Sequence, residues 1–165
     1  MRLAVASGKG GTGKTTVAAN LAYMAARIGR EAVYVDCDVE APNGGIFLAP
    51  RVDLREPVTL QVPRVDESLC THCGTCAEAC QFGAIAPIGG KVLLYQELCH
   101  ACGGCARFCP AGAITEVPRR VGERAMGAVN GLLYAEGRLD VGEVATTAVI
   151  DAVKSAAPAR DLTIL

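Results

Sequence analysis

Eight of the nine cysteines stand in two copies of one pattern, Cys-x2-Cys-x2-Cys-x3-Cys, and each cysteine of the second copy follows its counterpart by the same interval. The pattern is an internal repeat without insertions. Three cysteines so spaced form a tight loop that gives one [4Fe-4S] cubane three thiolates, so the fourth thiolate must come from elsewhere. The repeat predicts a unit that holds two clusters, with the ligands Cys70, Cys73, Cys76, Cys80, Cys99, Cys102, Cys105 and Cys109.

Zinc and disulfide bonds are the alternatives for these cysteines. Zinc sites also use paired cysteines, but they separate the two pairs by a longer loop. Disulfides need an oxidising compartment, whereas the chain opens directly into a strand-like run without a secretory signal pattern, so we expect a cytoplasmic protein. His72 and His100 lie between paired cysteines. Because cysteine fills every ligand place, we expect both histidines to be outer neighbours of the clusters or surface residues.

A phosphate-loop pattern, G-x-x-x-x-G-K-[ST], occupies residues 8–15. An apolar run at residues 3–6 predicts a strand before the loop, and a second apolar run at 32–36 predicts the next strand. Between them, apolar residues recur at helical spacing and end before Gly29, a helix-terminating residue: Val17, Leu21, Met24 and Ile28. The order of strand, loop, helix and strand is the context that a nucleotide-binding loop requires.

The residue types of the loop suit phosphate. Glycines let successive backbone N–H groups point at phosphate oxygens, and the helix amino terminus adds partial positive charge. Lys14 should contact the β- and γ-phosphates, and the Thr15 hydroxyl should help to hold Mg²⁺. We expect ATP to be bound by the loop residues Gly8, Lys9, Gly10, Gly11, Thr12, Gly13, Lys14, Thr15 and Thr16.

Two motifs resemble those of one ATPase class. The loop carries an additional lysine, Lys9, and residues 36–43 read D-x-D-x-x-x-P-N. Both are similar to the deviant Walker A ATPases, which include MinD, the chromosome-partitioning ATPases and the nitrogenase iron protein. The resemblance implies an α/β P-loop NTPase with a doubly wound, mostly parallel sheet, and a homodimer that sandwiches ATP. It implies three catalytic residues, Lys14, Lys9 reaching the partner's nucleotide and Asp38 orienting the attacking water, with Asp36 assisting Mg²⁺.

The cysteine repeat resembles the bacterial two-cluster ferredoxins, most closely where the second copy continues with Pro110 after Cys109. The first copy departs from that family because Gln81 follows Cys80, which supplies a backbone N–H that a proline lacks. In that family the fourth cysteine of each run ligates the other cluster. The resemblance therefore implies one cluster on Cys70, Cys73, Cys76 and Cys109, and another on Cys99, Cys102, Cys105 and Cys80.

Together, the motifs resemble ATPases of this class that carry an inserted two-cluster ferredoxin domain. We expect the ATPase domain at 1–62, the insert at 63–117 and the continuation of the ATPase domain at 118–165. Residues 51–67 lack a helical period and should form an extended connector. Residues 118–122 and 132–135 should be strands, and 146–156 a helix.

The last residues, 162–165, predict an apolar strand that we expect to be an unpaired edge of the sheet. In relatives this strand runs into an Asp-x-Pro-Pro-Gly switch that senses the γ-phosphate, and the sequence stops before it. We therefore expect the chain alone to hydrolyse ATP poorly, and to act as a homodimer or with a complementing chain.

The net charge of the chain indicates which class of partner it can bind. The formal net charge of −1 treats cysteines as neutral, and two thiolate-bound clusters would add about four negative charges. An acidic insert disfavours nucleic acid and favours a basic redox partner. No apolar run approaches the length of a membrane span.

The function expected from these motifs is an ATP-binding iron–sulfur protein that couples nucleotide state to electron transfer. Two alternatives remain. One is a ferredoxin-type electron carrier with a vestigial ATPase half, and the other is an iron–sulfur cluster assembly or carrier protein.

Overall fold

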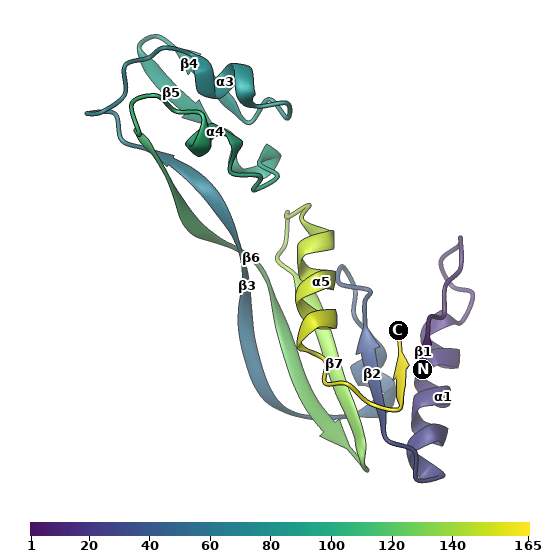
Figure 1. Ribbon diagram of the computed structural model, residues 1–165. Helices are drawn as coiled ribbons and strands as arrows, with labels where there is room; N and C mark the ends of the chain where they lie inside the picture. Colours follow the sequence, from purple (N-terminus) through teal and green to yellow (C-terminus); the bar gives the residue numbers. More distant parts are fainter. The chain divides into compact units, whose positions relative to one another are not determined.

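A six-stranded sheet organises the computed structural model, which describes residues 1–165 (Figure 1). The strands lie in the order β1 (Arg2–Leu3), β8 (Leu162–Ile164), β2 (Ala32–Asp36), β7 (Leu132–Leu139), β6 (Ile114–Val129) and β3 (Arg51–Val65). The strands from β1 to β7 in this order pair in parallel, and β6 is antiparallel to β7. The mixed, mostly parallel sheet with its helices confirms the predicted α/β class.

The chain divides into two compact units. The first comprises Met1–Val58 and Val121–Leu165, and the second comprises Thr59–Arg120. The chain therefore enters the second unit along β3 and leaves it along β6, two neighbouring strands of the sheet.

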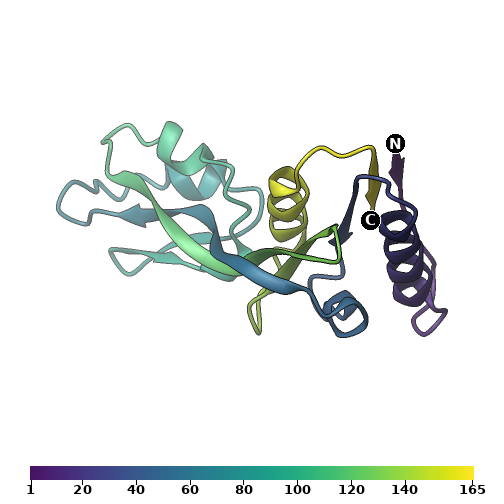
Figure 2. The ribbon, with the colours of Figure 1, turned by 90° about the horizontal axis from the view of Figure 1, so that it is seen from below.

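Helices cover both faces of the sheet in the first unit. Because successive side chains of a strand point to opposite faces, β2 serves two cores. On one face, Tyr34 packs with the alanines of α1 (Lys14–Arg27). On the other, Val33 and Val35 pack with Val153 of α5 (Thr146–Ala156). Figure 2 shows the dark purple α1 and the yellow α5 on either side of this strand.

Helix α1 forms where the sequence predicts it. The face that packs against the sheet is not, however, the stripe of large apolar residues that predicted the helix, Val17, Leu21, Met24 and Ile28. The buried residues are Ala18, Ala19, Ala22 and Ala25. The stripe used to predict the helix is exposed, from 43% for Leu21 to 70% for Ile28. Small side chains let the helix lie close to the sheet, which a row of leucine-sized residues would prevent. Gly29 then ends the helix with φ of 78°, as its left-handed conformation allows.

The strands that lead into and out of the second unit are longer than the sequence predicts. The expected extended connector is strand β3 of the sheet, and the expected short strands at 118–122 and 132–135 lie within β6 and β7. A two-residue turn joins β6 to β7, with positive φ at both Asn130 and Gly131. Asn-Gly favours such a turn because both residues tolerate this backbone conformation.

The expectation that residues 162–165 form a free sheet edge is wrong. Strand β8 pairs in parallel with β1 on one side and with β2 on the other. The edges of the sheet are β1 and β3. A strand that follows a helical crossover can enter a parallel sheet between earlier strands, so position in the chain does not give position in the sheet.

The second unit repeats its local structure as it repeats its sequence. Helix α3 (Thr75–Ala79) and helix α4 (Gly104–Arg107) begin at equivalent positions of the two copies, and each follows a glycine with positive φ. Between them lie a hairpin of β4 (Ile85–Ile88) and β5 (Lys91–Leu94), and the short helix η1 (Gln96–Leu98). Their core contains Cys76, Ile85 and Ile114.

Candidate functional site

The phosphate loop joins β1 to α1 and is open to its surroundings. Gly11 and Gly13 have φ of 71° and 86°, a conformation that other residues rarely adopt. The Ser7 hydroxyl accepts hydrogen bonds from the Lys9 N–H, at 3.2 Å, and the Thr12 hydroxyl, at 2.9 Å. No side chain caps the amino terminus of α1. Its first N–H groups therefore face a loop in which a phosphate can accept their hydrogen bonds.

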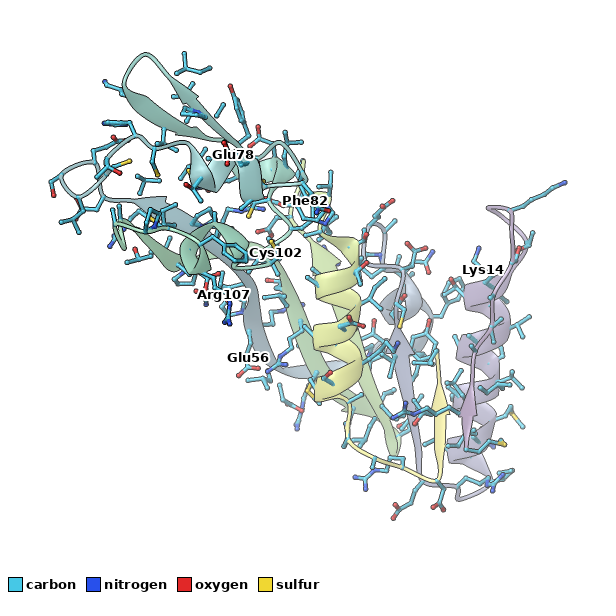
Figure 3. The ribbon with its side chains drawn as sticks, turned by 45° about the horizontal axis from the view of Figure 1, so that its top comes forward. Lys14, Glu56, Glu78, Phe82, Cys102 and Arg107 are labelled. Carbon is cyan, nitrogen blue, oxygen red and sulfur yellow. The ribbon has the colours of Figure 1, made fainter.

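An open pocket lies at the end of this loop, within the first unit. It is lined by residues of the loop, of the ends of β1 and β2 and of the chain terminus, including Lys14, Thr15, Asp36, Cys37 and Asp38. The structure thus brings together a lysine, a threonine and two aspartates from separate motifs of the sequence. Figure 3 shows Lys14 at the amino-terminal end of α1.

The other predicted loop residues do not line this pocket: Gly8, Lys9, Gly10, Gly11, Thr12, Gly13 and Thr16. The Lys14 ammonium group donates a hydrogen bond of 3.3 Å to the Lys9 carbonyl. Lys9 itself is exposed.

Asp36 is buried and holds the segment that follows β2. One carboxylate oxygen accepts a hydrogen bond of 3.1 Å from the Asp38 N–H. The other accepts bonds of 3.2 Å from Asn43 and 2.7 Å from Gly44, at the start of α2 (Gly44–Leu48). Burial raises the pKa of Asp36, and the three N–H groups oppose that rise. Asp36 therefore positions Asp38, and both of its oxygens are already engaged.

A buried tyrosine–glutamate pair beneath α2 was not predicted. Tyr134 donates a 2.7 Å hydrogen bond to Glu136, and both side chains belong to β7. The Tyr134 ring also stacks on Tyr34, with centroids 5.8 Å apart. Burial, first, and the bond to Glu136 raise the pKa of Tyr134. The sequence signal for this pair is a carboxylate that follows the largely apolar run at residues 132–135.

Two further pockets lie in the second unit, and four cysteines contribute to the lining of each. Each takes three cysteines from one copy of the repeat and the fourth from the other copy. One is lined by Cys99, Cys102, Cys105 and Cys80, and the other by Cys70, Cys73, Cys76 and Cys109. All nine cysteines are free thiols. Four thiols around one pocket are the donor set that an iron–sulfur cluster requires, so the residues present fit two clusters.

Burial and hydrogen bonding differ among these thiols. Burial raises the pKa of Cys76 and of Cys105, which occupy equivalent positions in the two copies. The hydroxyl of Thr75 lowers the pKa of Cys73. Near the second of these pockets, the ligand atoms of Glu67, Cys70 and His72 lie within 4.8 Å of one another. The backbone N–H of Ala101 donates a 3.4 Å hydrogen bond to the Cys99 sulfur.

Residues 3–157 match the family described as the CobQ/CobB/MinD/ParA nucleotide binding domain. The chain belongs to this family. The match agrees with the loop, the parallel strands and the pocket at their carboxyl ends. It confirms the predicted P-loop class and nucleotide binding. No helix in the structure has the length and apolar character needed to cross a membrane.

Curated relatives cover parts of the chain. An uncharacterized protein of Methanocaldococcus jannaschii is 36% identical over 52% of this chain and 30% of its own length. An uncharacterized ATP-binding protein of the same organism is 51% identical over 35% of this chain and 21% of its own length. The iron-sulfur cluster carrier protein of Bacillus subtilis is 57% identical over 22% of this chain and 10% of its own length. The chain spans about a third of the first relative's length.

Proposed function

We propose that this chain is an ATP-binding iron–sulfur protein that couples its nucleotide state to electron transfer through two [4Fe-4S] clusters. The observation that carries the proposal is the composition of the two cysteine pockets. Each holds four cysteines in the combination of three and one that the two-cluster ferredoxins use. Nucleotide binding rests on the family and on the pocket that contains Lys14 and Thr15.

The residues of the nucleotide pocket have separable roles in this proposal. The loop N–H groups and Lys14 bind the phosphates of ATP, and the Thr15 hydroxyl holds Mg²⁺. Asp38 lines the pocket and orients a water molecule, while Asp36 fixes the backbone on which Asp38 stands. Lys9 is exposed and lies outside its own pocket, which supports a contact with the nucleotide of a second copy.

The clusters, when bound, supply one-electron transfer. The protein contributes the eight thiolates, the apolar core that packs against several of these cysteines and the Ala101 N–H that bonds to the Cys99 sulfur. A basic protein of suitable potential is the redox partner that the expected negative charge favours.

A cluster carrier is the second candidate, and the names of relatives from Bacillus subtilis and Pseudomonas fragi favour it. Against it stands the number of cysteines in each pocket. A cluster held by four thiolates of one chain offers no open ligand place to an acceptor, whereas a transferable cluster needs exchangeable ligands.

Two measurements on the anaerobically purified chain test the proposal. Iron and sulfide analysis should find about eight irons per chain, and the protein should be reduced by single electrons. Lys14→Ala should abolish ATP binding, measured by calorimetry, without loss of iron, since the two sites share no residues. Lys91→Ala, which removes an exposed lysine of the second unit, is the control and should bind ATP normally.

Three results would contradict it. Iron content near zero would show that the chain holds no clusters. Unchanged ATP affinity in Lys14→Ala would show that the loop is not the nucleotide site. Rapid transfer of cluster iron to an apoprotein acceptor, without a reductant, would favour the carrier function.

A further inference from the structure

An aromatic pair stands at the rim of one cysteine pocket. Phe82 follows Cys80 by two residues, and His100 directly follows Cys99. Their rings stack with centroids 3.9 Å apart and an angle of 15° between their planes. Both residues line the pocket that contains these two cysteines (Figure 3 shows Phe82 near Cys102, another of its residues). Both residues are also exposed, so the stack joins the two copies of the repeat at the outer rim of this pocket.

The repeat provides an internal comparison. With the interval that separates Cys70 from Cys99, the position equivalent to Phe82 is Ala111, and the position equivalent to His100 is Thr71. Ala111 and Thr71 both line the other cysteine pocket. At the same two places, therefore, one pocket has a stacked pair of rings and the other has a methyl group and a small hydroxyl.

We propose that Phe82 and His100 form a lid that shields the cluster on Cys80, Cys99, Cys102 and Cys105, and that the other cluster is the more accessible to water and solutes. The proposal rests on the proposed function, since it assumes that both pockets hold clusters. It assigns Phe82 and His100 as positioning residues that act on a cluster without ligating it.

The two rings should exclude water from the pocket that they line. The two rings stack and place apolar area over the rim, and replacing them by Ala and Thr would leave that area to water. The other pocket does have an imidazole, His72, whose Nδ1 lies 3.8 Å from the Cys70 sulfur. Its equivalent in the shielded pocket is Ala101. In that pocket the residue equivalent to Phe82 is Ala111, so the pocket has no second ring there to stack on His72.

Shielding has two expected consequences. A chelator must pass the rim of the pocket to reach the iron. Because the two rings obstruct that rim, the shielded cluster should lose iron more slowly than the other cluster. A cluster with four thiolates is negatively charged and becomes more so on reduction, and a less hydrated site disfavours the added charge. The shielded cluster should therefore have the lower reduction potential of the two.

The test uses the complete, cluster-loaded chain and a water-soluble ferrous chelator under anaerobic conditions. Iron should leave the parent protein in two phases of equal amplitude, with rates that differ several-fold. Phe82→Ala should accelerate the slow phase several-fold and raise the lower of the two potentials, followed by electron paramagnetic resonance during a redox titration. Phe108→Ala is the control, because Phe108 is an exposed ring of the same unit that lines neither pocket.

A reciprocal variant tests the other pocket. The double substitution Thr71→His and Ala111→Phe supplies the missing rings and should slow the fast phase. Release of all the iron in one phase, or a Phe82→Ala variant with the parent's slow rate and potentials, would overturn the lid while leaving the two-cluster function intact. A parent protein without about eight irons would instead contradict the proposed function itself.

Discussion

Tyr134 donates a 2.7 Å hydrogen bond to Glu136, which lies two residues along on the same strand and therefore on the same face of the sheet. Glu136 is 7% exposed, and its other carboxylate oxygen lies 3.9 Å from the Arg55 guanidinium. Tyr134→Phe would leave a buried carboxylate with one partner fewer. We expect the free energy of unfolding to fall by about 1–3 kcal/mol, measured by urea denaturation.

Tyr23→Phe is the matched control for this prediction. Its hydroxyl accepts a 3.1 Å hydrogen bond from Arg27 on the exposed side of α1. Loss of a surface bond of this kind should change the unfolding free energy by less than about 0.5 kcal/mol. Equal effects of the two substitutions would show that burial of the Tyr134–Glu136 pair has no energetic consequence.

Gly44→Ala should destabilise the start of α2. A β-carbon at this position would overlap the Tyr34 ring and lie 2.8 Å from an Asp36 carboxylate oxygen. Because Asp36 also holds the Asp38 backbone, we expect weaker ATP binding together with a loss of roughly 1–3 kcal/mol in stability. Gly10→Ala, where a β-carbon meets nothing within 4 Å, is the stability control. An unfolding free energy of Gly44→Ala equal to that of the parent would refute the close approach.

Cys80→Ser should damage the cluster of the second cysteine run, although Cys80 belongs to the first. The reason is its place in the pocket with Cys99, Cys102 and Cys105. Combining Cys80→Ser with Cys102→Ser should release no more iron than Cys102→Ser alone, whereas combining it with Cys73→Ser should affect both clusters. Cys37→Ser, in the nucleotide pocket, should retain the parent's iron. Additive iron loss for Cys80 and Cys102 would contradict the shared site.

Cys37 should react slowly with iodoacetamide. Burial raises the pKa of its thiol above the ordinary value of 9.0, and nearby Lys154 partly opposes the rise. Since the thiolate is the nucleophile, the alkylation rate should still be increasing above pH 9. Lys154→Ala removes the opposing charge and should slow alkylation further at any pH below the pKa of the Cys37 thiol. Mass spectrometry of the cluster-loaded protein measures the adduct, and a rate that levels off below pH 9 would contradict the raised pKa.

Local chemistry explains what the sequence could predict. The phosphate loop needs glycines, a lysine and a hydroxyl in a fixed order, so residues 8–15 reveal it without knowledge of the rest of the fold. The parallel strands on which it depends follow from the apolar runs beside it. The family match confirms the predicted nucleotide-binding domain.

Long-range packing explains what the sequence could not predict. Alanines and larger apolar residues recur along α1 with the same period, and only the distance to the sheet decides that Ala22 is buried and Leu21 exposed. Strand order has no local signal either, so β8 was wrongly expected at the edge. The Phe82–His100 stack joins residues from two copies of the repeat, Phe82 just after the first cysteine run and His100 at a variable position within the second.

The neighbouring positions of β3 and β6 determine how much the length of the second unit matters to the first. The second unit begins at Thr59 and ends at Arg120, on two adjacent strands of one sheet. Because both connections leave the first unit on neighbouring strands, a segment of any length between them keeps those strands side by side. Closure of a longer loop adds only about 0.6 kcal/mol for each doubling of its length, so residues added to or removed from this segment should change the stability of the first unit little.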